Sequence, residues 1–552
     1  MTSKPGEQVL SIENLQVAFA TDAGTVNAVN GVSLEVRAGE VLAVVGESGS
    51  GKSVTARSVL RLLPSTAVTR GAIYLAGRDV LKLDREQLRQ ARGRDAAMVF
   101  QEPSLALNPV YTVGWQIIEG LRAHTPKGQR FDAKAARAKA IEILGKVGIP
   151  EPEVRIDYYP HQFSGGQKQR VVIACALVLE PKLILADEPT TALDVTVQAE
   201  ILDLLRTARE LTGAAIVLIT HNMGVVADMA DRVAVMYQGQ LVEQAEVHEL
   251  FANPKQQYTK RLLAAVPRIG QSAKPAFTAD ASVPPTVRAE NLEVVYPGRF
   301  GRPGFKAVAG VNFEIHAGEV VGLVGESGSG KTTIGRAMVG LAKATGGSMK
   351  VLGFDVVGAK ARQFKAVADQ VGFVFQDPAS SFNPLLTVGE AIAEPMLVHK
   401  VHASVAAARA DIEALLAAVQ LPVEYFDRYP HELSGGQRQR ASLARALALK
   451  PKLVIADEPT SALDVSVQAK VLELFAKLQR EFGFACLFIT HDLAVVDQIA
   501  HRVLVMHRGE LVEQGETRDV LTNPQQQYTK RLVQSSPIAD PTLQRAKAAA
   551  RH

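Results

Sequence analysis

Two tandem α/β domains, each with an inserted helical subdomain, are the fold that the sequence predicts. The motifs GESGSGK, SGGQ, ADEPT, ITH and QYTKRL each occur twice in the same order, and the last four pairs lie 270 residues apart. Short apolar runs such as VLAVV alternate with amphipathic stretches, which is typical of parallel strands joined by helices. Between Gln101 and Ser164, and between Gln376 and Ser434, helix-favouring segments replace these runs and indicate the insertion.

The repeat divides the chain into one domain at 1–266 and a second at 287–536. The segment between them, 267–286, is rich in Pro, Ala and Ser and has no helical or strand period, so it is predicted to be a linker. The last residues, 537–552, are predicted to form a short frayed tail.

The composition is that of a globular protein. Of 552 residues, 47% are hydrophobic and 21% are charged, which excludes disorder as the dominant state. The formal net charge is only +4, so a polybasic protein is not indicated and we expect no nucleic-acid partner. The two cysteines, Cys175 and Cys486, are too few for a disulfide scaffold, a four-thiolate zinc site or a cysteine-ligated iron–sulfur cluster.

Membrane insertion and export are not indicated either. The longest apolar run, 171–179, is about half of what a membrane-spanning helix needs. The N-terminus has no apolar segment behind a basic start. We therefore expect the chain to stay in the cytoplasm.

Each copy has a glycine-rich loop between an apolar strand and a helix. In such loops backbone N–H groups point at phosphate oxygens, the lysine neutralises the β and γ phosphates, and the hydroxyl that follows it binds Mg²⁺. Two occurrences disfavour a chance match, and a nucleoside triphosphate is the predicted ligand. The predicted binding residues are Gly46, Ser48, Gly49, Ser50, Gly51, Lys52 and Ser53 in the first copy, and Gly325, Ser327, Gly328, Ser329, Gly330, Lys331, Thr332 and Thr333 in the second.

An Asp-Glu pair ends a second apolar strand in each copy. Alone, such a pair is more often a helix cap or a solvated turn. Here it follows a phosphate loop twice, and adjacent buried acids are costly unless a cation or water uses them. We expect Asp187 and Asp457 to hold Mg²⁺ through water, and Glu188 and Glu458 to orient and deprotonate the attacking water.

A histidine and a glutamine follow further apolar runs. A structural role is the common alternative for His221 and His491, but their matching positions favour a hydrogen bond to the γ-phosphate. Gln101 and Gln376 precede proline-containing loops, and taken alone they are better explained as loop residues bonded to backbone.

SGGQ begins a predicted helix in each copy, with the serine as its N-cap. The glycines leave the backbone bare, so this end is a potential anion site. Each copy already has its own phosphate loop, and the simplest solution is that each SGGQ helix faces the nucleotide of the other copy. The residues concerned are Ser164, Gly165, Gly166 and Gln167, and Ser434, Gly435, Gly436 and Gln437.

With these motifs in this order, both copies resemble the ATP-binding cassette domains of ABC transporters over almost the whole chain. The resemblance implies two tandem P-loop NTPase domains that bind ATP and Mg²⁺ and hydrolyse ATP. It implies that Gln101 and Gln376 contact the metal and the attacking water. It also implies that Phe19 and Tyr296 stack on adenine, although core packing is the alternative for Phe19.

The family also implies how the two copies cooperate. Two ATP–Mg²⁺ would be held head to tail, one between 46–53 and 434–437 and the other between 325–332 and 164–167. The loops Ala192-Leu193-Asp194 and Ala462-Leu463-Asp464 would communicate between these sites. Both copies keep the full set of residues, so two active sites are predicted.

A narrower resemblance is to the peptide and nickel importer branch, carried by LNP and FNP after the two glutamines and by NP(K/Q)QQYTKRL near each domain end. The fused form is similar to that of glutathione-type and microcin-type importers. It implies an ATPase at the cytoplasmic face of the inner membrane, bound to two transmembrane permease subunits and served indirectly by an extracytoplasmic substrate-binding protein. Some members carry C-terminal cysteines that this chain lacks, so we expect no cluster.

Two alternative functions compete with this one. A soluble tandem cassette protein that acts on ribosomes typically has a long charged linker, and DNA-repair cassettes carry zinc cysteines or a long coiled coil. Neither feature is found in this sequence. A small-molecule P-loop kinase would leave the SGGQ pair and the duplication unexplained.

Overall fold

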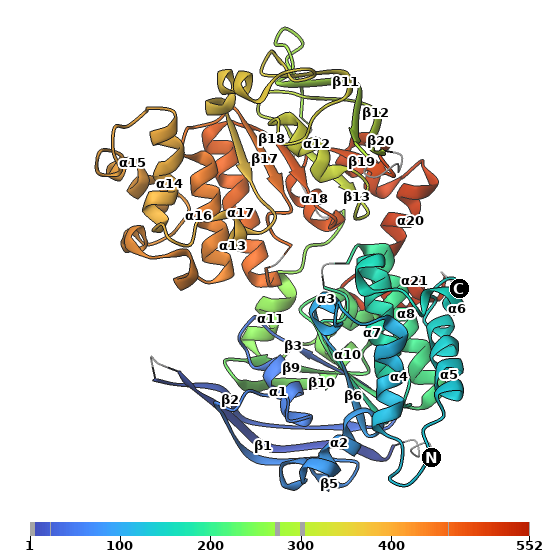
Figure 1. Ribbon diagram of the computed structural model, residues 1–552. Coiled ribbons are helices and arrows are strands. Elements are labelled where there is room, and N and C mark those ends of the chain that lie inside the picture. The colour runs from blue at the N-terminus through green and yellow to red at the C-terminus, as the bar shows by residue number, and fades with distance from the viewer. Residues whose placement is uncertain are drawn as a thin grey trace. The chain divides into compact units, whose positions relative to one another are not determined.

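The computed structural model describes residues 6–21, 24–191, 193–270, 277–298, 304–461 and 463–550. Contacts divide the chain into two units (Figure 1). Unit 1 comprises Met1–Leu193, Val197–Val266 and Pro537–His552, and unit 2 comprises Asp194–Thr196 and Pro267–Ser536. The predicted α/β class is confirmed in both units. Among the described residues, no helix combines the length and apolar character needed to cross a bilayer.

A six-stranded sheet forms the centre of unit 1, in the order β10-β9-β3-β8-β7-β6. Neighbouring strands are parallel except that β10 is antiparallel to β9. Every residue of β3, β7 and β8 is buried, as expected for parallel strands covered on both faces. The elements are β3 (Val41–Val45), β6 (Ala96–Val99), β7 (Leu183–Asp187), β8 (Ala215–Ile219), β9 (Arg232–Tyr237), β10 (Gln240–Glu246), α1 (Lys52–Val59), α8 (Val195–Thr212), α9 (Met223–Met229), α10 (Val247–Ala252) and α11 (Gln257–Ala264).

A four-stranded antiparallel sheet, β2-β1-β4-β5, packs on one face of this core. Its residues Ile12 and Ile73 share a buried cluster with Leu42 and Val44 of β3. The sequence does not predict this sheet, because a bulge at Asn14, where φ is 46°, interrupts the apolar alternation of β1. The elements are β1 (Gln8–Thr21), β2 (Gly24–Arg37), β4 (Ala67–Leu75), β5 (Arg78–Asp79), η1 (Val80–Lys82) and α2 (Arg85–Arg94).

The predicted helical subdomain is confirmed, since every regular element between Gln101 and Ser164 is a helix. The side chains of Thr112 and Asp132 cap its two long helices by accepting backbone N–H bonds. Ile117 of α4 is fully buried in the cluster that continues into the six-stranded sheet. The elements are α3 (Pro103–Ala106), α4 (Val113–Ala123), α5 (Ala133–Lys146), α6 (Pro152–Arg155), η2 (Pro160–Gln162) and α7 (Gly165–Leu177).

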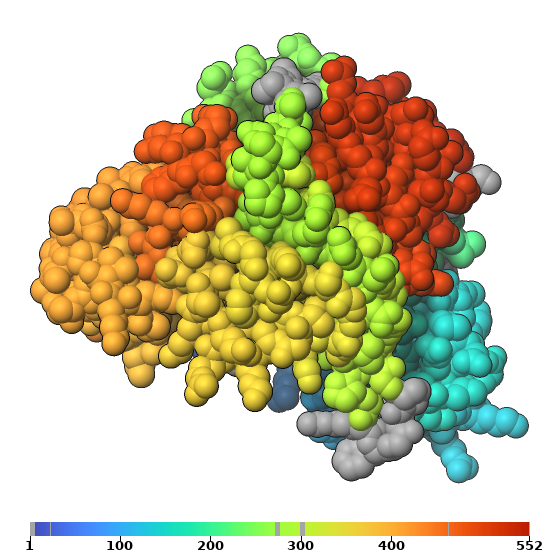
Figure 2. All heavy atoms as spheres, turned by 90° about the horizontal axis from the view of Figure 1, so that it is seen from above, coloured from blue at the N-terminus to red at the C-terminus, as the bar shows by residue number. Residues whose placement is uncertain are grey.

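Unit 2 repeats this architecture, with sheets β12-β11-β14-β15 and β16-β17-β18-β13-β19-β20. In Figure 1 its orange helical subdomain lies to the left, while β11 and β12 lie to the right, and Figure 2 shows the orange subdomain at the left edge. The strands are β11 (Val287–Tyr296), β12 (Phe305–Ile315), β13 (Val320–Gly325), β14 (Gly346–Val351), β15 (Phe354–Asp355), β16 (Val371–Val374), β17 (Leu453–Asp457), β18 (Ala485–Ile489), β19 (Arg502–His507) and β20 (Glu510–Glu516). The helices are α12 (Lys331–Met338), η3 (Ala361–Ala366), η4 (Ala368–Gln370), α13 (Pro378–Ser381), α14 (Val388–Val398), α15 (Val405–Ala418), η5 (Val423–Asp427), η6 (Pro430–Glu432), α16 (Gly435–Leu447), α17 (Val465–Phe482), α18 (Leu493–Ile499), α19 (Thr517–Thr522) and α20 (Gln527–Ser535).

The end of the chain differs from the predicted frayed tail. Residues 541–549 form α21 (Pro541–Ala549), which belongs to unit 1 and packs on α9 and α10. Gln544 is buried there, and Arg545 donates a hydrogen bond to the Ala230 carbonyl. The predicted linker, 267–286, is counted with unit 2, where the Gly270 N–H donates to Asp497 Oδ2 at 2.9 Å. Residues 271–276, 551 and 552 of these two segments lie outside the described residues.

Candidate functional site

The strand order brings the predicted site residues of each unit to one edge of its six-stranded sheet. In unit 1 the glycine-rich loop follows β3, His221 follows β8, Asp187 ends β7 and Gln101 follows β6, and these four strands are parallel neighbours. Unit 2 places the equivalent residues after β13, β18, β17 and β16. Carboxyl ends of parallel strands are where α/β proteins bind ligands.

The glycine-rich loop has a backbone shape that other residues cannot take. Gly46 and Gly51 have φ values of 148° and 96°. A Cβ at Gly46 would overlap the Met236 carbonyl oxygen, and one at Gly51 would overlap that of Ala28. Unit 2 repeats this geometry at Gly325 and Gly330. The loop therefore presents its backbone at close quarters, as a phosphate site requires.

The lysine that ends each loop is buried under it. Lys52 is 6% exposed, and its Nζ donates to the carbonyl oxygens of Gly46 at 2.8 Å and Glu47 at 2.7 Å. Lys331 makes the equivalent bonds to Gly325 and Glu326, each at 2.8 Å. Burial lowers the pKa of Lys331, because the charged ammonium is poorly solvated. Such an ammonium is stabilised by an anion bound in the loop.

A buried aspartate is tied to the hydroxyl that follows the lysine. Ser53 Oγ donates to Asp187 Oδ1 at 2.7 Å, and Thr332 Oγ1 donates to Asp457 Oδ1 at 2.9 Å. Asp187 Oδ2 is buried without a hydrogen-bond partner, and Arg57 Nη2 lies 3.7 Å from it. Burial raises the pKa of both aspartates, because it penalises the charged carboxylate.

This donor set fits Mg²⁺. Hydroxyl and carboxylate oxygens are the ligands that Mg²⁺ prefers, and Asp187 has a carboxylate oxygen to spare. Across the part of the chain that the structure describes, no group of three or more His, Cys, Asp or Glu could hold a metal by itself. A cation here would therefore also need oxygens from its bound substrate, which is how Mg²⁺ binds in phosphate sites.

Glu188 lies at the centre of a hydrogen-bonded cluster. Its carboxylate accepts from Gln101 Nε2 at 2.9 Å and Thr191 Oγ1 at 2.8 Å, and His221 Nδ1 lies 3.2 Å away. Burial raises the pKa of Glu188, but His221, Thr191 and Lys52 together outweigh it, so that the pKa is lowered overall. The carboxylate is therefore ionised at neutral pH and available as a proton acceptor.

Glu458 has a similar cluster in unit 2. Gln376 Nε2 donates to its Oε2 at 3.0 Å, and His491 Nδ1 lies 3.4 Å from the same atom. Against the effect of burial, His491 and other partners lower the pKa of Glu458, while Glu458 raises the pKa of His491. In both units the glutamine thus contacts a carboxylate, whereas the sequence alone favoured a hydrogen bond to the backbone.

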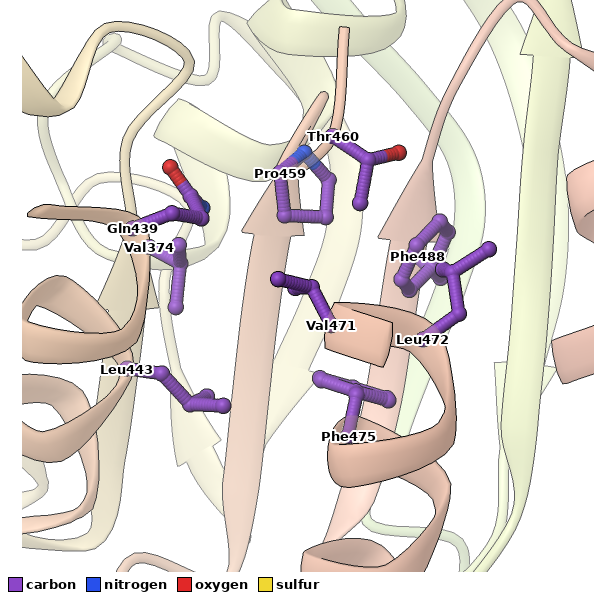
Figure 3. Close-up of a pocket in the computed structure, with 9 residues that line it drawn as sticks. All are labelled: Val374, Gln439, Leu443, Pro459, Thr460, Val471, Leu472, Phe475 and Phe488. Carbon is purple, nitrogen blue, oxygen red and sulfur yellow. The ribbon is translucent and has the colours of Figure 1, made fainter. Parts of the chain in front are cut away.

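The backbones of Glu188 and Glu458 are strained. Glu188 has φ of 49° and Glu458 has φ of 46°, the left-handed region that costs a non-glycine residue about 1–3 kcal/mol. The turn after Glu458 borders a cavity with room for about one water molecule, about 10 Å³ (Figure 3). Pro459 and Thr460 line it on one side and Gln439 of α16 on another. Surrounding packing therefore has to hold this turn in place.

The SGGQ segments begin α7 and α16 as predicted N-caps. Ser164 Oγ accepts from the Gln167 N–H at 3.3 Å, and Gln167 Oε1 accepts from the Ser164 N–H at 3.1 Å. Ser434 and Gln437 form the same capping box at 3.4 and 2.8 Å. A Cβ at Gly165 would meet nothing within 4 Å, so this helix start is open. Its first N–H groups can bind an anion.

The two aromatic residues lie at the end of the antiparallel sheet in each unit. Phe19 of β1 is half-buried: it packs against the apolar cluster of that sheet and keeps part of its surface exposed. Tyr296 ends β11 and is 41% exposed. Ala192 and Ala462 of the Ala-Leu-Asp loops lie outside the described residues.

Sequence reasoning missed three residues of these sites. Thr191 bonds the Glu188 carboxylate, whereas its counterpart Ser461 donates to the Glu458 backbone carbonyl at 3.2 Å. Tyr258 and Tyr528 each bond a phosphate loop. The sequence alone assigns the two tyrosines no role. The repetition of QYTKRL was the signal that could have pointed to them.

Two family models match the chain. The one described as ABC transporter matches residues 29–191 and 308–461, which together exceed half of the chain. The one described as Oligopeptide/dipeptide transporter, C-terminal region, matches residues 242–292 and 512–552. Each model therefore matches once in each half of the repeat.

Individual relatives match over nearly the full length. The chain is 44% identical to the glutathione import ATP-binding protein GsiA of Pectobacterium atrosepticum, over 98% of this chain and 91% of that protein. It is 44% identical to GsiA of Escherichia coli K12, over 97% of this chain and 91% of that protein. Among solved structures, the dimeric ATP-binding cassette MJ0796 bound to ADP and Pi is 28% identical and covers 43% of this chain and 98% of its own, with a TM-score of 0.39.

Because the two aspartates are buried, we expect their charges to lower the stability of the unliganded chain and to be needed for binding of magnesium nucleotide. Replacing both by Asp187→Asn and Asp457→Asn removes two desolvated charges but keeps the bond from Ser53 or Thr332. We expect the unliganded chain to unfold about 2–4 °C higher for each kcal/mol regained, and the added stability from magnesium nucleotide to be lost. Differential scanning calorimetry with and without MgATP measures both.

Asp132→Asn is the matched control, because Asp132 is an exposed helix N-cap and asparagine caps equally well. It should change neither value. An Asp187→Asn, Asp457→Asn chain that keeps the full stabilisation by MgATP would contradict the assignment of the aspartates.

Proposed function

The chain belongs to the ABC transporter family, and we propose that it is the ATP-hydrolysing subunit of an importer of glutathione or similar short peptides. The observation that carries the substrate class is the 44% identity to glutathione import ATP-binding proteins over 98% of the chain. The match of both C-terminal regions to the oligopeptide/dipeptide transporter model supports the same class.

Each unit binds one ATP through its phosphate loop. Backbone N–H groups of residues 46–53 and 325–332 donate to phosphate oxygens, and Lys52 and Lys331 turn from loop carbonyls to the β and γ phosphates. Phe19 and Tyr296 stack on the adenine. Ser53, Asp187 and Gln101, with Thr332, Asp457 and Gln376 in unit 2, would hold Mg²⁺, which when bound neutralises phosphate charge.

The glutamates perform the proton transfer. Glu188 and Glu458 accept a proton from the attacking water, and their lowered pKa keeps them ionised for this step. His221 and His491 lie against these carboxylates and bond the γ-phosphate. Gln101 and Gln376 donate to these carboxylates and orient the carboxylate and the water.

The SGGQ helix starts are candidate anion sites. Residues 164–167 begin α7 and residues 434–437 begin α16, and a Cβ at Gly165 would meet nothing within 4 Å. We assign both helix starts to the γ-phosphate of bound ATP. Loss of that phosphate weakens these contacts.

The loops that follow the two glutamines transmit this motion to permease subunits in the membrane. Leu105 is 80% exposed, Val110 is 71% exposed and Leu385 is 81% exposed. Tyr111 and Trp115 stack on each other nearby, with ring centroids 4.0 Å apart. Exposed apolar groups on a loop are typical of a protein-binding surface. Permease subunits bound to these loops would hold the chain at the membrane.

The general-base assignment predicts the effect of removing each carboxylate. Glu188→Gln or Glu458→Gln should lower ATP turnover by about 10²–10⁴-fold at the altered site. The double variant should lose turnover and still bind ATP, because glutamine keeps the size of the side chain and one acceptor oxygen. Steady-state phosphate release and equilibrium ATP binding measure the two effects. Glu210→Gln, on the exposed face of α8, is the matched control, and full turnover in the double variant would refute the assignment.

The transport function predicts a specific uptake defect. A strain that lacks the chain should lose uptake of labelled glutathione or short peptides. The wild-type gene should restore this uptake, and a gene with both Glu188→Gln and Glu458→Gln should not. The assay compares glutathione, dipeptides, oligopeptides and nickel complexes. Unchanged uptake of all four, together with co-sedimentation of the chain with ribosomes, would support the soluble alternative instead.

A further inference from the structure

The function proposed above leaves one repeated motif without a role. QYTKRL forms the start of α11 in unit 1 and of α20 in unit 2. Both copies lie within the segments that match the C-terminal region of oligopeptide/dipeptide transporters. Its tyrosines, Tyr258 and Tyr528, are placed against the phosphate loops.

Each tyrosine holds the second residue of its phosphate loop. Tyr258 Oη accepts a hydrogen bond from the Glu47 N–H at 3.0 Å, and Tyr528 Oη accepts one from the Glu326 N–H, also at 3.0 Å. The same loop residues bind the loop lysines through their carbonyl oxygens. The carbonyl of Gly46, which also accepts from Lys52, lies in the same peptide unit as the Glu47 N–H, and Gly325 repeats this in unit 2. Hydrogen bonds therefore run from the tyrosine hydroxyl through one peptide unit to the lysine ammonium.

The tyrosine rings are themselves held by the strand that supports the loop. Tyr258 packs on Tyr237, with ring centroids 4.4 Å apart, and Tyr528 stacks on His507 at 4.0 Å. Tyr237 and His507 end β9 and β19, next to the methionine carbonyls against which Gly46 and Gly325 pack. The tyrosine ring and the loop glycine in each unit thus pack against neighbouring residues at the end of the same strand.

The hydroxyl is suited to this contact at any physiological pH. Tyr258 is 9% exposed, and burial raises the pKa of Tyr528 to about 12. The phenol therefore stays neutral, and its oxygen accepts the loop N–H without bringing a negative charge near the phosphates.

We propose that Tyr258 and Tyr528 are positioning residues that hold the phosphate loops, and through them the loop lysines, in the shape that binds triphosphate. When Lys52 leaves the Gly46 carbonyl for a phosphate, Tyr258 keeps that peptide unit in place through the Glu47 N–H. The C-terminal region of each domain thereby sets the nucleotide affinity of the domain. The inference rests on the proposed ATP-binding function.

Removing only the hydroxyls tests it. The Tyr258→Phe, Tyr528→Phe chain keeps both rings and their stacking and loses one bond to each loop. We expect KM and Kd for MgATP to rise about 3- to 10-fold, the effect of one lost hydrogen bond, while kcat stays within about twofold. Amide hydrogen exchange in peptides spanning Glu47 and Glu326 should become faster. Tyr74→Phe, on β4 of unit 1, removes a hydroxyl elsewhere and should change none of these values.

The outcomes are distinguishable. An unchanged Kd and unchanged exchange at Glu47 and Glu326 would overturn the proposal, and so would a fall in kcat and unfolding temperature with Kd unchanged, which indicates a merely structural role. If the wild-type chain bound no ATP, the proposed function would fail, but faster exchange in the phenylalanine variant would still establish the contact.

Discussion

Desolvated charge at the carboxyl edge of each parallel sheet is the constraint on which the rest of the structure depends. Lys52, at the start of α1, and Asp187, at the end of β7, are buried, and Glu188 next to Asp187 is half-buried. Burial works against the charge of both Lys331 and Asp457 in the second unit. A bound polyphosphate with its cation would supply counter-charges for these buried groups.

Packing around the carboxyl edge of the sheet holds the phosphate loop and the glutamate turn in backbone conformations that the local sequence does not favour. Loop glycines allow the backbone to approach the end of β9, and the turn at Glu188 is held in a left-handed conformation. The two units differ in one hydroxyl, since Thr191 bonds a carboxylate where Ser461 bonds a backbone carbonyl. The glutamate of unit 1 therefore has one more donor than that of unit 2, within otherwise equivalent sites.

The sequence predicted most of the site because its parts are short continuous motifs at strand ends. Lys52 and Ser53 are adjacent, and so are Asp187 and Glu188, so strand order alone brings them together. The contact of Tyr258 with Glu47 spans 211 residues and depends on how α11 packs, which no local pattern encodes. The antiparallel sheet was hidden by its bulge, and α21 was missed because a helix stabilised by docking has no strong signal of its own.

The central claim is that each unit binds one nucleotide through its own phosphate loop. Equilibrium dialysis of the chain against MgATP, with hydrolysis blocked by Glu188→Gln and Glu458→Gln, measures it most directly. The account predicts two nucleotides per chain, and one when Lys52→Ala or Lys331→Ala is added. A chain that saturates with one nucleotide before either lysine is changed, or that keeps both after one is removed, would contradict it.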